Sequence, residues 1–129
     1  MSDALYLDSA DALRRVMPGA AHACQCALQR CTGWDSVGQA DWPQAHMHAV
    51  GTLRDPALDE PTFEEHHPQG TRYESPQAPV AVKFFPYNRC DVFACQQCQQ
   101  TVLRYTEFGG YYVDPRARRI APEQVIDTP

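Results

Sequence analysis

The apolar positions of this chain follow helical spacing only near its start. A helix is predicted there because Asp8 or Ser9 can accept a hydrogen bond from the free N–H groups of a first turn. The apolar side of this helix consists of Ala10, Leu13, Val16 and Met17. Pro18-Gly19 would end it, and a second helix is predicted over residues 20–30.

From Gly33 onward the pattern changes to short alternating runs, which are typical of strands. Strands are predicted over residues 47–53, 80–85, 91–94, 101–107 and 111–113. Gly109-Gly110 suits a tight turn between the last two, because adjacent glycines adopt positive φ angles at little cost. The last three runs therefore predict an antiparallel meander. Residues 55–65 contain five acids and no base, so they are expected to form a solvated loop.

The length of 129 residues and the eleven prolines fit one domain with many turns. Together with the helical and strand patterns they predict a single α+β domain. One or two helices within residues 1–33 would pack on a mainly antiparallel sheet formed by residues 34–129.

The balance of 11 basic and 16 acidic residues gives a net charge of -5, which makes nucleic acid an unfavourable partner. The acidic start has no secretory signal pattern, and no apolar run approaches the roughly 20 residues of a membrane helix. We therefore expect a cytoplasmic protein with no membrane contact. Its six cysteines are then interpreted as buried thiols, metal ligands or redox groups.

Cys95 and Cys98 form the most specific motif, Cys-x-x-Cys, between two predicted strands. Two thiolates at this spacing can bind one tetrahedral Zn²⁺ at the tip of a hairpin. Residues 92–105 resemble half of a zinc ribbon, and this resemblance implies structural zinc. The alternative is two ordinary cysteines near a turn.

The third and fourth zinc ligands are not fixed by the motif. Cys90 is the nearest cysteine, but five residue steps of extended chain would place it roughly 16 Å from Cys95, so the chain would have to fold back. His67, in a loop, is the preferred fourth candidate. The spacing Cys-x4-Cys-x2-Cys also matches the start of an iron–sulfur loop, but no later cysteine completes that site.

The remaining cysteines and histidines have less specific patterns. On a helix, Cys24 and Cys31 would share a side with Leu28 while Cys26 pointed elsewhere, so packing inside the core is favoured over metal binding. His46-x-His48 lacks the glutamate and glycines that follow the metal motif of cupins.

Two further functions compete with structural zinc. The first is thiol–disulfide chemistry at Cys95 and Cys98. The second is a metal-free module that binds an unknown protein partner through aromatic and arginine side chains, namely Tyr105, Phe108, Tyr111, Tyr112, Arg116, Arg118 and Arg119. The alternative for the four aromatic residues is that they form the core and rim of the meander. A run of three arginines is more often a solvated surface. No phosphate-binding glycine loop, nucleophile elbow or His-Glu-x-x-His pattern is present, which favours a non-enzyme.

Three stretches of the second half of the chain carry a family resemblance. They are His67-Pro-Gln-Gly-Thr-Arg-Tyr, Pro86-Tyr-Asn-Arg-Cys-Asp-Val and Arg104-Tyr-Thr-Glu-Phe-Gly-Gly-Tyr-Tyr-Val-Asp. Over residues 67–119 the chain resembles a small bacterial family to which no activity is assigned. The resemblance implies a cytoplasmic location and no particular chemistry.

Overall fold

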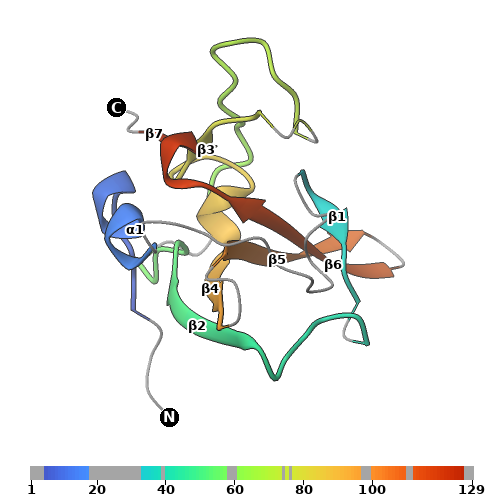
Figure 1. Cartoon of the computed structure of the whole chain (residues 1–129). Helices are drawn as coiled ribbons and strands as arrows, with labels where there is room; N and C mark the ends of the chain where they lie inside the picture. The colour runs from blue at the N-terminus through green and yellow to red at the C-terminus, as the bar shows by residue number, and fades with distance from the viewer. Residues whose placement is uncertain are drawn as a thin grey trace.

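The computed structural model describes residues 5–17, 33–38, 40–57, 61–73, 75, 77–96, 100–109 and 112–126. Its main element is a five-stranded antiparallel sheet with the order β1-β6-β5-β4-β2. The strands are β1 (Asp35–Ser36), β2 (Met47–Thr52), β4 (Asp91–Cys95), β5 (Thr101–Gly109) and β6 (Tyr112–Ile120). Figure 1 shows β5 and β6 as the longest hairpin of the molecule. The predicted antiparallel meander is therefore confirmed.

The N-terminal helix α1 (Ala10–Val16) is confirmed. Ser9 caps it, because its hydroxyl accepts a hydrogen bond from the N–H of Ala12 at 3.1 Å. The guanidinium of Arg14 donates to the carbonyl of Val125 at 2.7 Å and so ties α1 to β7 (Val125–Ile126). The second predicted helix, over residues 20–30, lies outside the described residues.

The hairpin of β5 and β6 is longer than the sequence predicts. Its register runs without a break from Thr101 opposite Ile120 to Gly109 opposite Tyr112. Pro115 does not interrupt β6, because its carbonyl faces β1 and accepts the N–H of Val37 at 2.8 Å. Its missing N–H would point the same way, so no bond between β5 and β6 is lost.

A register shift between Ala49 and Gly51 breaks the predicted alternation of β2. Gly51 is buried where the N-terminal segment runs alongside β2, and Tyr6 pairs in parallel with Thr52 as an isolated bridge. A Cβ on Gly51 would lie 2.8 Å from the carbonyl oxygen of Leu5. The close approach of the two segments therefore requires glycine at this position.

The strand predicted over residues 80–85 is wrong in length and in pattern. Only β3 (Val80–Ala81) is a strand, and it pairs in parallel with β7 in a separate two-stranded sheet. Val80, Ala81 and Val82 are all buried, so this run does not alternate between a covered and an exposed side. A turn and the short helix η1 (Tyr87–Arg89) follow it.

Two apolar clusters lie on opposite faces of the main sheet, because successive residues of a strand alternate between faces. We call the first the helix face; it contains Cys90, Val92 and Leu103 and is covered by α1, β3 and β7. We call the second the loop face; it contains Cys95, Val102 and Ala117 and is covered by Val37 and Trp42 from the segment between β1 and β2.

The acidic stretch has no helix or strand over its described residues, 55–57 and 61–65, in agreement with the expected loop. Within the described part of the chain, no helix is long and apolar enough to cross a membrane.

Candidate functional site

The Cys-x-x-Cys motif lies in the connection between two antiparallel strands. Cys95 is the last residue of β4, and β5 begins at Thr101. The N–H of Cys95 donates to the carbonyl of Gln100 at 2.9 Å, which closes the hairpin across the connection. On the other side, the N–H of Gln96 donates to the carbonyl of His46 at 2.7 Å. Cys98 lies outside the described residues.

The first cysteine of the motif is a buried, free thiol. Its exposed fraction is 1%, and it packs on the loop face with Met47, Val102 and Ala117. Reactive redox cysteines are accessible to solvent and to their partners, whereas ligands of structural zinc are enclosed. The burial of Cys95 therefore fits a structural role better than an exchange role.

The structure does not bring Cys90 to Cys95. β4 runs as a continuous strand between them, and Cys90 belongs to the helix face. Cys90 is fully buried, and its thiol donates to the carbonyl of Pro86 at 3.2 Å. Burial raises the pKa of this thiol well above its ordinary value, and the charge of Asp91 raises it further. A zinc ligand must be a thiolate, so these surroundings oppose metal binding at Cys90.

Both ring nitrogens of His67 are engaged within its own loop. Nε2 lies 2.7 Å from Oε1 of Glu65, and Nδ1 lies 2.8 Å from the hydroxyl of Thr71. A metal at His67 would have to displace one of these two partners. Among the described side chains, no three His, Cys, Asp or Glu residues gather as a metal site. Cys24, Cys26 and Cys31 lie outside that part of the chain.

The arginine run of β6 does not form a solvated surface. Arg118 is fully buried on the helix face, and its guanidinium donates to the carbonyl of Ala78 at 2.7 Å and to the hydroxyl of Tyr87. Desolvation lowers the pKa of Arg118. The sequence-based expectation was wrong because alternation along β6 turns every second side chain toward the core, whatever its charge.

Arg116 lies on the same face of β6 as Arg118 and binds the side chain of Tyr73. Its Nε donates to Asp114 at 2.9 Å, and its Nη1 donates to the hydroxyl of Tyr73 at 3.0 Å. The bond from Arg116 holds the pKa of Asp114 below its usual value. Tyr73 in turn shares a hydrogen bond between hydroxyls with Tyr105.

The aromatic side chains near this network are largely core. Tyr105 is buried, and the ring of Trp34 lies edge-on to it at 4.9 Å between centroids. The aromatic and arginine surface proposed from the sequence is therefore contradicted at Tyr105 and Arg118. Tyr111 lies outside the described residues, as do the side chains of Phe108 and Tyr112.

Sequence reasoning missed an aromatic group that is exposed. Phe63 has an exposed fraction of 63%, and its ring centroid lies 5.6 Å from that of Phe85. The guanidinium of Arg89 lies 4.1 Å from the centroid of Phe63. The signal available in the sequence was a single phenylalanine among the acids of residues 55–65, a pattern that is also common in ordinary loops.

A polar concavity on the sheet was not predicted either. Its volume is about 380 Å³, and its lining includes Asp91, Arg104 and Thr106. The guanidinium of Arg104 lies 4.2 Å from the ring centroid of Trp42. The register of β4 and β5 places Asp91 opposite Arg104, and Trp42 reaches Arg104 from the segment between β1 and β2.

No family model matches this chain, and neither a curated protein nor a solved structure is similar to it. Function must therefore be argued from the site itself.

Proposed function

We propose that this is a small non-catalytic protein in which Cys95 and Cys98 bind a structural zinc ion at the turn between β4 and β5. The supporting observation is the position of the motif between antiparallel strands, closed by the bond from Cys95 to Gln100. Paired cysteines in a hairpin turn are a common half of a tetrahedral zinc site. A closed site of four protein ligands leaves no position for a substrate, so its binding energy would stabilise the fold.

The same position disfavours a thiol–disulfide exchange protein. Exchange at Cys-x-x-Cys relies on a helix that begins at the motif, because its N-terminus lowers the pKa of the first thiol. Here Gln100 and β5 follow the motif within a few residues. A strand has only a small net dipole and offers no comparable stabilisation of a thiolate.

Two more ligands are needed to complete the tetrahedral site. Cys90 and His67 are the candidates from the sequence, and each would have to give up its present hydrogen-bond partners. The chain also contains Cys24, Cys26 and Cys31. Serine or alanine substitution of each of these five residues, followed by metal analysis, would identify the ligands that complete the site.

The deciding experiment is the metal content of the full chain purified without added metal. We expect about one zinc per chain, and replacement by Co²⁺ should produce thiolate-to-metal charge-transfer absorption. Cys95→Ser and Cys98→Ser should each lose the metal. Val102→Ala is the matched control, because it alters a buried side chain on the same face as Cys95 that cannot bind metal, and it should retain zinc. A wild-type protein without metal would refute the proposal, and disulfide-reductase activity would favour the exchange function.

A further inference from the structure

Phe63 differs from the other large apolar side chains that are exposed in the described part of the chain. Leu5 and Val113 are exposed to a similar extent, at 61% and 62%, but their aliphatic side chains offer no aromatic face to a cation. Phe63 stands beside Phe85, and the two segments are joined because the N–H of Phe85 donates to the carbonyl of Glu64 at 2.7 Å. Its ring is therefore held in place although most of it faces solvent.

The ring of Phe63 already binds a cation within the chain. The guanidinium of Arg89 lies 4.1 Å from the centroid of Phe63 and 5.5 Å from that of Phe85. Nη2 of Arg89 also donates to the carbonyl of Pro61 at 2.6 Å, which fixes the guanidinium over the rings. Since 63% of Phe63 stays exposed, Arg89 covers only part of its aromatic surface.

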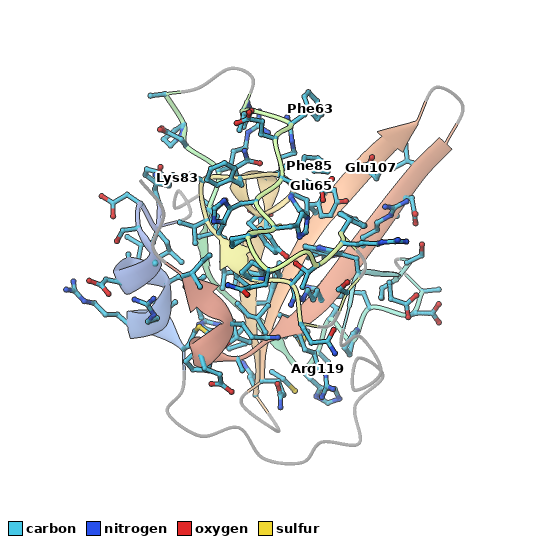
Figure 2. The ribbon with its side chains drawn as sticks, turned by 90° about the horizontal axis from the view of Figure 1, so that it is seen from above. Phe63, Glu65, Lys83, Phe85, Glu107 and Arg119 are labelled. Atoms are coloured by element: carbon cyan, nitrogen blue, oxygen red, sulfur yellow. The ribbon has the colours of Figure 1, made fainter. Side chains whose placement is uncertain are left out.

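Three carboxylates belong to segments next to these rings. Glu64 and Glu65 follow Phe63 in the chain and are exposed. Glu107 lies on β5, and its charge contributes to the raised pKa values of Tyr73 and Tyr105, whose rings both contact Phe85. Figure 2 shows Phe63, Glu65, Phe85 and Glu107 on one side of the molecule.

We call this surface the Phe63 patch and define it by Phe63, Glu64, Glu65, Phe85 and Glu107, with Arg89 beneath it. The patch has three carboxylates and one guanidinium, and one of the carboxylates, Glu65, already lies 2.7 Å from Nε2 of His67. Its charge is therefore negative, in keeping with the net charge of the whole chain. A cation that approaches the open surface of Phe63 would meet an aromatic face and nearby carboxylates at the same time.

We propose that the Phe63 patch is a docking site for an arginine-bearing segment of a partner protein. A guanidinium of the partner stacks on the part of the Phe63 ring that Arg89 leaves exposed, and it donates hydrogen bonds to Glu64 or Glu107. Arginine fits better than lysine, because its planar group can stack on the ring and bind a carboxylate with two parallel bonds. A partner rich in acids would be repelled by the same carboxylates.

The test uses the full chain and an N-acetylated, C-amidated peptide of alternating glycine and arginine. In an NMR titration we expect amide shifts of residues 61–65, 85 and 107, and weaker binding as the salt concentration rises. A glycine and lysine peptide should bind less tightly. A glycine and glutamate peptide should not bind.

Substitutions at Phe63 separate the aromatic contribution from that of apolar area. Phe63→Leu keeps an apolar side chain but removes the ring, and it should weaken binding of the arginine peptide about two- to five-fold. Phe63→Trp should bind at least as tightly as the wild type. Leu5→Ala and Val113→Ala are matched controls at equally exposed apolar positions and should leave the affinity unchanged.

Substitutions of carboxylates test the charge contribution. Glu64→Gln and Glu107→Gln should each weaken binding about two-fold. Glu123→Gln, an exposed acid on the short helix η2 (Pro122–Gln124), is the control and should have no effect. Unchanged melting temperatures would show that each variant remains folded.

Three outcomes would overturn the proposal. The first is the absence of shifts in residues 61–65, 85 and 107 at millimolar peptide. The second is equal binding by Phe63→Leu and the wild type, which would leave only apolar contact. The third is concentration-dependent self-association that Phe63→Leu abolishes without any peptide, since the patch would then bind a second copy of this chain.

Discussion

The helix face and the loop face of the main sheet each place an arginine of the meander against an aromatic ring, but in different surroundings. On the helix face, Arg118 is fully buried beside Tyr87, and desolvation lowers its pKa. On the loop face, Arg104 lies over Trp42 at the polar concavity and is only partly buried. Arg118 is therefore part of the core, whereas Arg104 covers the edge of the apolar cluster on the loop face.

This difference follows from what covers each face. The helix face is covered by α1, β3, β7 and the segment around Tyr87, and Arg118 on this face is fully buried. Among the described residues, the loop face is covered mainly by Val37 and Trp42, and a concavity lies at Arg104. These residues form a smaller cover than that of the helix face, so we expect the loop face to gain more stability from a zinc ion at Cys95.

The largest expected effect is on the helix face, at Arg118. Arg118→Ala would remove the donor to the carbonyl of Ala78 and to the hydroxyl of Tyr87, and would leave a cavity. We expect the free energy of unfolding to fall by about 3 to 5 kcal/mol. Urea denaturation followed by circular dichroism measures it. A loss below about 1 kcal/mol would mean that Arg118 is not part of the core.

The next effect concerns the loop face and the proposed zinc. If free zinc is present at about one hundred times its dissociation constant, its removal by a chelator should lower the free energy of unfolding by about 3 kcal/mol. The measurement is denaturant unfolding with and without chelator. Cys98→Ser should already lack the stability that zinc contributes, so the chelator should not change its free energy of unfolding. An equal response of Cys98→Ser and the wild type would show that the metal binds elsewhere.

A smaller effect returns to the helix face and depends on pH. Burial raises the pKa of Tyr87 to about 12 from 10.0, so the folded state favours its protonated form. This contribution is complete below pH 10 and is lost as the pH rises toward 12, because the unfolded chain releases the proton first. At pH 11 the loss is about 1.4 kcal/mol relative to pH 8.

The reference for this pH effect is Tyr87→Phe. The variant should be less stable at pH 8, because Arg118 loses an acceptor, but its stability should fall less steeply between pH 8 and pH 11. Urea midpoints at both pH values give the comparison. If the urea midpoints of wild type and variant fall equally between pH 8 and pH 11, Tyr87 has the same pKa in the folded and unfolded states.

Local patterns in the sequence predicted the elements that depend on local chemistry. The cap at Ser9, the alternation in residues 101–107 and the paired glycines were enough to predict α1 and the hairpin of β5 and β6. The length and pairing of the strand in residues 80–85 could not be predicted in this way, because β3 pairs with β7, some 45 residues later in the sequence. Apolar runs that are buried on both sides also lack alternation.

The same limit applies to the candidate site. The sequence predicted a strand over residues 91–94 with Cys95 in the turn after it, and β4 extends one residue further to include Cys95. It also predicted a solvated surface at Arg118, because charge alone does not reveal that β6 turns this side chain toward Tyr87. The cation contact between Arg89 and Phe63 joins residues 26 positions apart, and no local pattern predicts such a contact.

The smallest expected effect is at Arg104, the counterpart of Arg118 on the loop face. Arg104→Ala would remove the guanidinium from the ring of Trp42 and should cost about 0.5 to 1 kcal/mol in urea denaturation. Arg104→Lys should recover part of this loss, because the charge remains but the planar stacking does not. Arg72→Ala, at an exposed arginine outside both clusters, serves as the control and should change stability by less than about 0.5 kcal/mol. If Arg104→Ala instead costs as much as Arg118→Ala, the concavity does not expose Arg104 to solvent, and the two faces of the sheet are equally well covered.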